Sequence, residues 1–148
     1  MEIEKMSLFD KLLEQIAPIP GIEVPPKVYL EMEPEVIDYE ENYSLTIRFP
    51  IKERYQNPIG HMQGGMIVTA VDNTFGPLSY LLAPPSVTTQ LNTQYIRPVL
   101  PTDKHIDVTA TLVEKTNGQL ILKAKVLNEK RKIVAICQAT QQIIRTLS

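Results

Sequence analysis

The segment that decides the fold is Gln63–Leu82, which reads QGGMIVTAVDNTFGPLSYLL. The run from Met66 to Leu82 has the length of a helix and is apolar on most sides. A helix that is apolar nearly all round is usually buried. We expect Gly76-Pro77 to kink or end the helix near its end, because proline lacks a backbone N–H. The sequence therefore predicts one long, buried helix.

Apolar and polar residues alternate in several runs on both sides of this helix. A period of two is typical of half-buried strands. The pattern predicts an antiparallel pair of strands before the helix and four strands after it, namely 28–33, 43–49, 86–98, 106–112, 120–126 and 133–144. The acidic stretch Asp38–Asn42 is expected to form the turn of the first pair. Asn117-Gly118, a strong hairpin signal, and Glu129–Arg131 are expected to connect later strands.

Apart from an N-terminal segment, the chain has one predicted helix and about six predicted strands. The economical packing wraps an antiparallel sheet around that helix, which is an α+β arrangement. We expect a single domain over residues 27–148. Before it, Ser7–Ala17 has helical spacing with Ser7 as N-cap, and four prolines at 18, 20, 25 and 26 make an extended connector.

The composition excludes several classes of protein. With a formal net charge of -2, the chain lacks the basic character of a nucleic-acid-binding protein. Cys137, the only cysteine, lies in an apolar strand pattern and is expected to be a core residue. There is no apolar run of membrane-spanning length and no signal-peptide pattern at the N-terminus, so we expect a soluble, cytoplasmic protein that does not bind a membrane. His61 and His105 are far apart and suggest no metal site.

Three features of residues 57–73 could take part in catalysis or ligand binding. Gly64-Gly65 opens the helix, where unpaired backbone amides can polarise a carbonyl group. Asp72 lies two turns into an otherwise apolar helix, where it either has a structural partner, lies at a subunit boundary, or belongs to a functional site. Asn57 lies in a loop rich in turn residues, which favours a role in the turn over ligand binding.

These residues also carry a family resemblance. Asn57-Pro58-Ile59-Gly60, then Gln63-Gly64-Gly65, then Asp72-Asn73, resembles the N-x-x-G…H-G-G…D stretch of PaaI-type hotdog thioesterases. The segment 88–99, TTQLNTQYIRPV, resembles the strand that follows the central helix in that family. The resemblance covers roughly residues 43–144 and implies the hotdog fold, in which a sheet wraps a central helix.

The resemblance implies a role for each matching residue. Asp72 matches the nucleophile or general base of thioester hydrolysis, and Gly65 matches the amide that polarises the thioester carbonyl. Asn57 matches a side chain that positions substrate or water, and Thr88 matches a hydroxyl beside the carboxylate. Gly64 and Asn73 match the substrate-binding part of the motif, Gly64 at the same helix start as Gly65. In this family the site lies between two subunits.

One position departs from the family pattern: Gln63 replaces the usual histidine. Glutamine can still donate and accept a hydrogen bond, but it cannot titrate near neutral pH. The leading expectation is an acyl-CoA thioesterase, acting on an acyl or aroyl thioester without a metal or other cofactor. The alternative is a hotdog protein that binds acyl-CoA or lipid without catalysis. The resemblance implies a homodimer or homotetramer, and the Thr-, Gln- and Asn-rich segment Ser86–Pro98 suits edge-to-edge pairing with a second copy.

Overall fold

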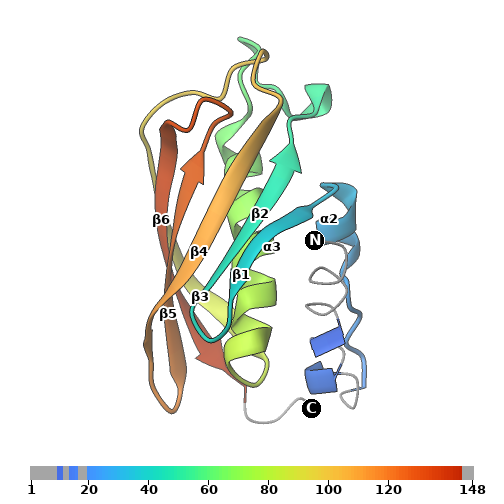
Figure 1. Ribbon diagram of the computed structural model, residues 1–148, viewed down its shortest axis with the longest axis vertical. Helices are drawn as coiled ribbons and strands as arrows, with labels where there is room; N and C mark the ends of the chain where they lie inside the picture. The colour runs from blue at the N-terminus through green and yellow to red at the C-terminus, as the bar shows by residue number, and fades with distance from the viewer. Residues whose placement is uncertain (1–9, 12–13, 17–19, 145–148) are drawn as a thin grey trace.

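The computed structural model describes residues 10–11, 14–16 and 20–144 (Figure 1). Of the helix expected over Ser7–Ala17, Asp10, Lys11 and residues 14–16 are helical, while Ser7 and the remaining positions lie outside the described residues. Ile16 is buried.

A six-stranded antiparallel sheet and one long helix make up the body of the protein (Figure 1). The sheet order is β1-β2-β4-β5-β6-β3. The strands are β1 Glu35–Glu40, β2 Ser44–Pro50, β3 Ser86–Tyr95, β4 His105–Lys115, β5 Gln119–Leu127 and β6 Ile133–Ile143. The helices are α2 Lys27–Glu31, the 3-10 turn η1 Glu53–Tyr55 and the central α3 Gly64–Leu82. The predicted α+β architecture, a sheet around one long helix, is confirmed.

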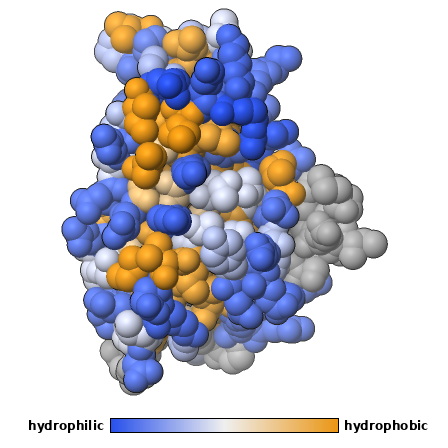
Figure 2. All heavy atoms as spheres, turned by 60° about the vertical axis from the view of Figure 1, so that its left-hand side comes forward, coloured by the Kyte–Doolittle hydropathy of each residue, from blue (hydrophilic) through white to orange (hydrophobic). Residues whose placement is uncertain are grey.

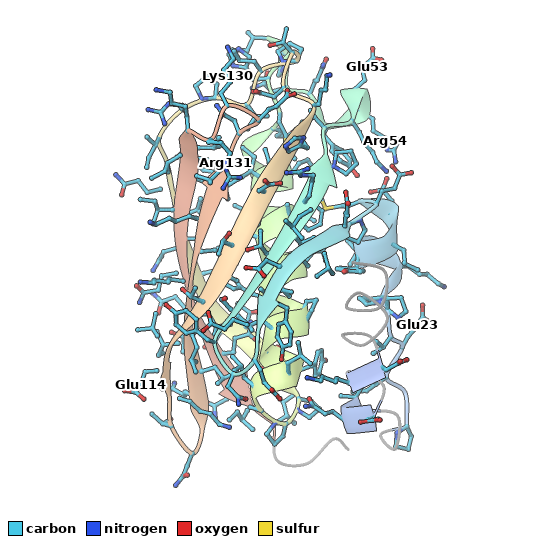
Figure 3. All side chains as sticks on the ribbon, in the orientation of Figure 1. Glu23, Glu53, Arg54, Glu114, Lys130 and Arg131 are labelled. Carbon is cyan, nitrogen blue, oxygen red and sulfur yellow. The ribbon has the colours of Figure 1, made fainter. Side chains whose placement is uncertain are left out.

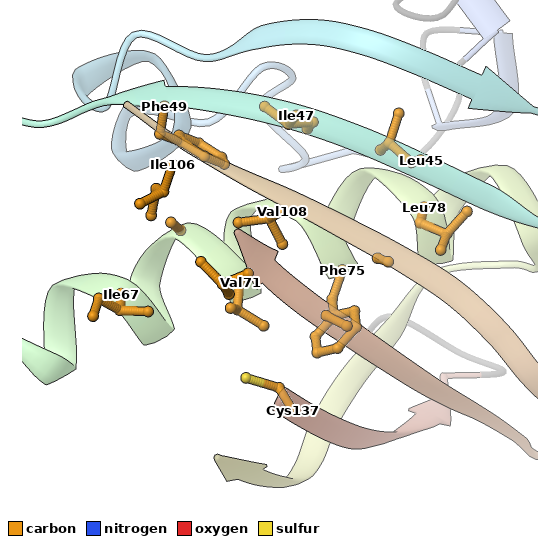
Figure 4. Close-up of a cluster of buried hydrophobic side chains, with 14 of the residues drawn as sticks. Leu45, Ile47, Phe49, Ile67, Val71, Phe75, Leu78, Ile106, Val108 and Cys137 are labelled. Carbon is orange, nitrogen blue, oxygen red and sulfur yellow. The ribbon is translucent and has the colours of Figure 1, made fainter. Parts of the chain in front are cut away.

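The core lies between α3 and the inner face of the sheet (Figure 4). Leu45, Ile47 and Phe49 alternate along β2 and are fully buried, as their period of two predicts. Phe75 and Leu78 of α3, three residues apart, meet them from the helix and are also fully buried. Each such side chain contributes roughly 1.5–3 kcal/mol of hydrophobic stabilisation. Cys137 is buried in the same cluster, which confirms its expected role.

The strand expected over residues 28–33 is wrong, because α2 occupies most of that segment. The Pro26 carbonyl accepts hydrogen bonds from the amides of Tyr29 and Leu30 and so closes the first helical turn. Tyr29 and Met32, three residues apart, are the buried positions, whereas Val28 is exposed. In so short a run, alternating apolar residues fit a helix and a strand about equally well.

The first strand instead comes later, and its end overlaps the expected turn. β1 extends to Glu40, and the turn to β2 occupies residues 41–43 rather than 38–42. The two later hairpins form as expected. The amide of Thr116 donates to the Gln119 carbonyl around Asn117-Gly118, and the turn after β5 contains residues 129–131.

Helix α3 begins at Gly64 and does not end at Pro77. It continues to Leu82, because Leu78, Leu81 and Leu82 are buried beyond the proline and their packing offsets the lost hydrogen bond. Among the described residues, no helix has the length and hydropathy needed to cross a membrane.

Candidate functional site

One face of α3 is not covered by the sheet. Gly65 and Asp72 are exposed, and Gly76 is partly exposed, although the helix is otherwise largely buried. Positions seven and eleven residues apart lie on nearly the same side of a helix. The sequence pattern suggested a helix buried nearly all round, and the structure instead leaves this face open.

The two glycines at the start of α3 differ in their surroundings. A Cβ on Gly64 would lie 3.0 Å from the Cζ and hydroxyl oxygen of Tyr95, whose hydroxyl donates to the Gly64 carbonyl oxygen at 2.8 Å. A Cβ on Gly65 would meet nothing nearer than the Nε2 of Gln63 at 4.0 Å. A side chain at Gly64 would therefore press against the Tyr95 ring, whereas Gly65 leaves the backbone open to an incoming group.

The amide of Gly65 is available at the helix N-terminus. Among the residues that the structure describes, the first backbone amide of the helix to donate a hydrogen bond is that of Met66, which donates to the Gln63 carbonyl oxygen at 2.9 Å. Gln63 is the N-cap residue, and its exposed side chain makes no capping hydrogen bond. A free amide at this position, reinforced by the helix dipole, is suited to a carbonyl oxygen or oxyanion.

Asn57 shapes the loop that precedes the helix. Its Oδ1 accepts hydrogen bonds from the amides of Ile59 at 3.1 Å and His61 at 3.0 Å. This arrangement is a typical use of asparagine in a turn. The Asn57 side chain also lines a shallow hollow of about 350 Å³ with Gly64, Tyr95 and neighbouring residues.

The structure brings Asp72 and Thr88 together. A hydrogen bond from the Thr88 side chain lowers the pKa of the Asp72 carboxyl, while partial burial, the larger effect, raises it. The net pKa is above the ordinary value of an aspartate. Although the residue is exposed at the surface of the single chain, its carboxyl group is thus less well hydrated than a freely solvated one.

Gly65 and Asp72 do not meet within one chain. Seven residues of α-helix span about 10 Å at a rise of about 1.5 Å per residue. One thioester carbonyl cannot contact both groups across that distance, because a hydrogen bond requires a separation of about 3 Å. The predicted residues form two groups, one with Asn57 and the glycines and one with Asp72 and Thr88.

Asn73, the neighbour of Asp72, is buried and faces α2. Its Nδ2 donates to the Val28 carbonyl oxygen at 3.3 Å and contacts the Met32 sulfur at 3.2 Å. In this arrangement Asn73 fastens α2 to α3 beside the candidate carboxylate. Within the described part of the chain, no cluster of His, Cys, Asp or Glu is suited to hold a metal ion.

Strand β3, which carries Thr88, lies at one edge of the sheet and is largely exposed on both faces. Val87 and Tyr95 are among its exposed apolar residues. Figure 2, which turns the left-hand side of Figure 1 forward, shows hydrophobic patches between hydrophilic side chains. An edge strand with free backbone groups and exposed apolar residues is suited to pair with another strand.

Comparison with known proteins agrees with this architecture. Neither a family model nor a curated protein matches the sequence. Among solved structures, the PaaI protein of the E. coli phenylacetic acid degradation operon aligns over 93% of this chain and 96% of its own, with a TM-score of 0.77 and 14% identity. Thioesterase HI1161 from Haemophilus influenzae aligns over 84% and 87%, with a TM-score of 0.75 and 17% identity. A Streptococcus mutans protein, smu.793, bound to acetyl CoA, aligns over 85% and 95%, with a TM-score of 0.72 and 18% identity. The chain has the hotdog fold of these proteins.

Proposed function

We propose that this protein is an acyl-CoA thioesterase whose active site forms between two copies of the chain. Asp72 of one subunit acts as nucleophile or general base, and the Gly65 amide of the other polarises the thioester carbonyl. As general base, Asp72 takes a proton from a water molecule that adds to the carbonyl carbon; as nucleophile, it attacks that carbon itself, and water then hydrolyses the resulting anhydride. In both cases the carbon–sulfur bond breaks, and the thiolate of coenzyme A takes up a proton that comes from the water.

The observation that carries this proposal is the arrangement of α3. Its open face presents a free amide at Gly65 and, about 10 Å away along the helix, the carboxylate of Asp72. The pKa of the Asp72 carboxyl is raised above its ordinary value. A second helix running in the opposite direction, related by a two-fold axis, would place a partner Gly65 opposite Asp72. Pairing of β3 with its symmetry copy would create that axis, and the exposed edge of β3 supports it.

Coenzyme A thioesters are the proposed substrates for two reasons. Thioester hydrolysis needs a group that polarises the carbonyl and a carboxylate that attacks it or activates water, and this chemistry requires no metal or redox cofactor. The Gly65 amide and the Asp72 carboxylate are the proposed groups. Proteins of the same fold include smu.793 bound to acetyl CoA and a hypothetical thioesterase protein from Streptococcus pneumoniae with coenzyme A. The latter aligns over 78% of this chain and 88% of its own, with a TM-score of 0.71 and 16% identity.

A non-catalytic acyl-CoA-binding protein is the second candidate, and Gln63 is the observation that favours it. This side chain is exposed, makes no capping hydrogen bond, and stands where the family pattern has histidine. If the histidine transfers a proton, a glutamine at this position leaves binding intact but slows turnover.

Thiol release from a panel of acyl-CoAs separates the two candidates. The panel includes short, medium, long and aromatic acyl groups, and it compares the wild type with Asp72→Asn. The matched control is Asp38→Asn, an exposed aspartate on β1 at the opposite edge of the sheet. We expect turnover that is lost in Asp72→Asn and retained in Asp38→Asn. Saturable binding without thiol release in the wild type would favour the second candidate.

A further inference from the structure

A second cavity, of about 140 Å³, lies beside Asp72 on the flank of α3 that the N-terminal connector covers. Its walls are mainly apolar, and come from the connector, α2 and α3 through Ile22, Val24, Tyr29, Asp72, Gly76 and Tyr80. Glu23, labelled in Figure 3, lies on this connector. The connector precedes residues 43–144, the segment that resembles the thioesterase family.

Gly76 opens this cavity one turn of helix after Asp72. A Cβ at this position would meet nothing within 4 Å, and its backbone has no positive φ that would require glycine. Glycine inside a helix destabilises it by roughly 0.5–1 kcal/mol relative to alanine. The missing side chain therefore leaves empty space at Asp72 without any benefit to the helix.

We infer that this cavity receives the acyl group of the substrate, and that it selects a compact apolar group up to about the size of one phenyl ring. The inference rests on the proposed function, because it places the thioester carbonyl at Asp72. An apolar cavity of about 150 Å³ in another protein takes up benzene, so a space of the present size admits a benzoyl or hexanoyl tail. A long fatty acyl chain does not fit.

Asp72 connects the cavity to the reacting group. Its side chain lines the cavity and is also exposed at the surface. A carbonyl carbon held at this carboxylate has the apolar cavity on one side, for the acyl chain. The thiol portion extends away from the cavity, toward the face of α3 that the proposed partner subunit meets. Phe75, the neighbour of Gly76 on α3, packs in the core and does not line this cavity.

The test fills the cavity from Gly76. Gly76→Ala and Gly76→Leu are compared with the wild type in kcat/KM for acetyl-, hexanoyl-, benzoyl- and palmitoyl-CoA. Dissociation constants for the same four thioesters are measured by calorimetry in an Asp72→Asn background. Gly118→Leu is the matched control, because Gly118 lies in the β4–β5 turn and lines none of the cavities described above. Thermal unfolding reports on folding, and Gly76→Ala is expected to be at least as stable as the wild type.

We expect the wild type to prefer hexanoyl- or benzoyl-CoA. Gly76→Leu should reduce kcat/KM and affinity for these two by roughly tenfold or more and leave acetyl-CoA nearly unchanged, with a smaller effect in the same direction for Gly76→Ala. A preference for palmitoyl-CoA, or an equal loss across the panel, would overturn the inference. The same applies if Gly76→Ala is destabilised without a change in acyl preference, since Gly76 would then serve only the backbone beside Pro77.

The two proposals fail separately. Turnover that depends on Asp72 but shows no change of acyl preference at Gly76 refutes the acyl cavity alone. Size-selective binding that Gly76→Leu abolishes, without thiol release in the wild type, refutes the thioesterase alone.

Discussion

The Thr88 side chain on the edge strand β3 hydrogen-bonds to the Asp72 carboxyl on α3, and this bond opposes the effect of burial on the carboxyl group's pKa. Two elements of the fold therefore meet at the candidate carboxylate. If Asp72 reacts as the carboxylate, catalysis requires its ionised form, and activity rises as the pH increases through its pKa.

Thr88→Val removes the interaction that lowers this pKa. We expect the acidic limb of the pH profile of kcat/KM to move to higher pH, because the carboxylate then forms less readily. Thr88→Ser keeps a hydroxyl group, so its acidic limb should lie at the same pH as that of the wild type. An unchanged limb in Thr88→Val, or a shift to lower pH, would contradict this role of Thr88.

Asp72→Asn is expected to raise the melting temperature at pH 7. The pKa of Asp72 in the folded state is above its ordinary value, so ionisation of the carboxyl disfavours folding. The stability that the protonated carboxyl provides is present at acidic pH and is lost as the pH rises through the raised pKa. The difference between variant and wild type should narrow as the pH falls into that range. An Asp72→Asn variant with a lower melting temperature than the wild type at pH 7 would contradict the conclusion that partial burial disfavours the ionised carboxyl.

The two glycines at the start of α3 should respond differently to alanine. Gly64→Ala places a methyl group against the Tyr95 ring and disturbs its hydrogen bond, which should lower the free energy of unfolding by about 1 kcal/mol. Gly65→Ala should retain stability but reduce kcat/KM by roughly tenfold to a hundredfold, because the methyl group crowds the amide that meets the carbonyl. Equal effects of the two variants on turnover would contradict the distinction.

The buried Asp107 is held by two arginines of unequal importance. Arg48 donates to both carboxylate oxygens, through Nε at 2.8 Å and Nη2 at 3.0 Å, while Arg131 makes one bond at 2.9 Å. The exposed fraction of the side chain is 36% for Arg48 and 65% for Arg131. We expect Arg48→Met to lower the free energy of unfolding by about 1–3 kcal/mol, and Arg131→Met by less. Denaturant unfolding of both variants measures these two decreases. A larger decrease in Arg131→Met than in Arg48→Met would contradict the prediction.

The sequence predicted the central elements because their patterns are long. The helix over Met66–Leu82 and the hairpin at Asn117-Gly118 depend on many residues, or on a specific turn pair, and both are present in the structure. The short run at residues 28–33 was misassigned, because Pro26 starts a helix where alternation alone suggested a strand.

The candidate site was less accessible to sequence reasoning. The Asp72–Thr88 pair followed from a resemblance, since the two residues are on different elements and no local pattern links them. The fit of Tyr95 against Gly64 requires contacts between distant segments, and the sequence carried no signal for it. Gly76 was interpreted only as a helix breaker beside Pro77, whereas the structure shows that it borders a cavity.

The central claim is that Asp72 of one subunit acts with Gly65 of its partner, and subunit mixing tests it most directly. Asp72→Asn and Gly65→Val, each expected to be inactive alone, are unfolded together in equal amounts, refolded and assayed for thiol release. Each refolded alone is the control. A mixed dimer contains one site with both native residues, so random pairing should restore about a quarter of wild-type activity. Activity no higher than that of the separate variants, in a mixture shown to contain mixed dimers, would contradict a site shared between subunits.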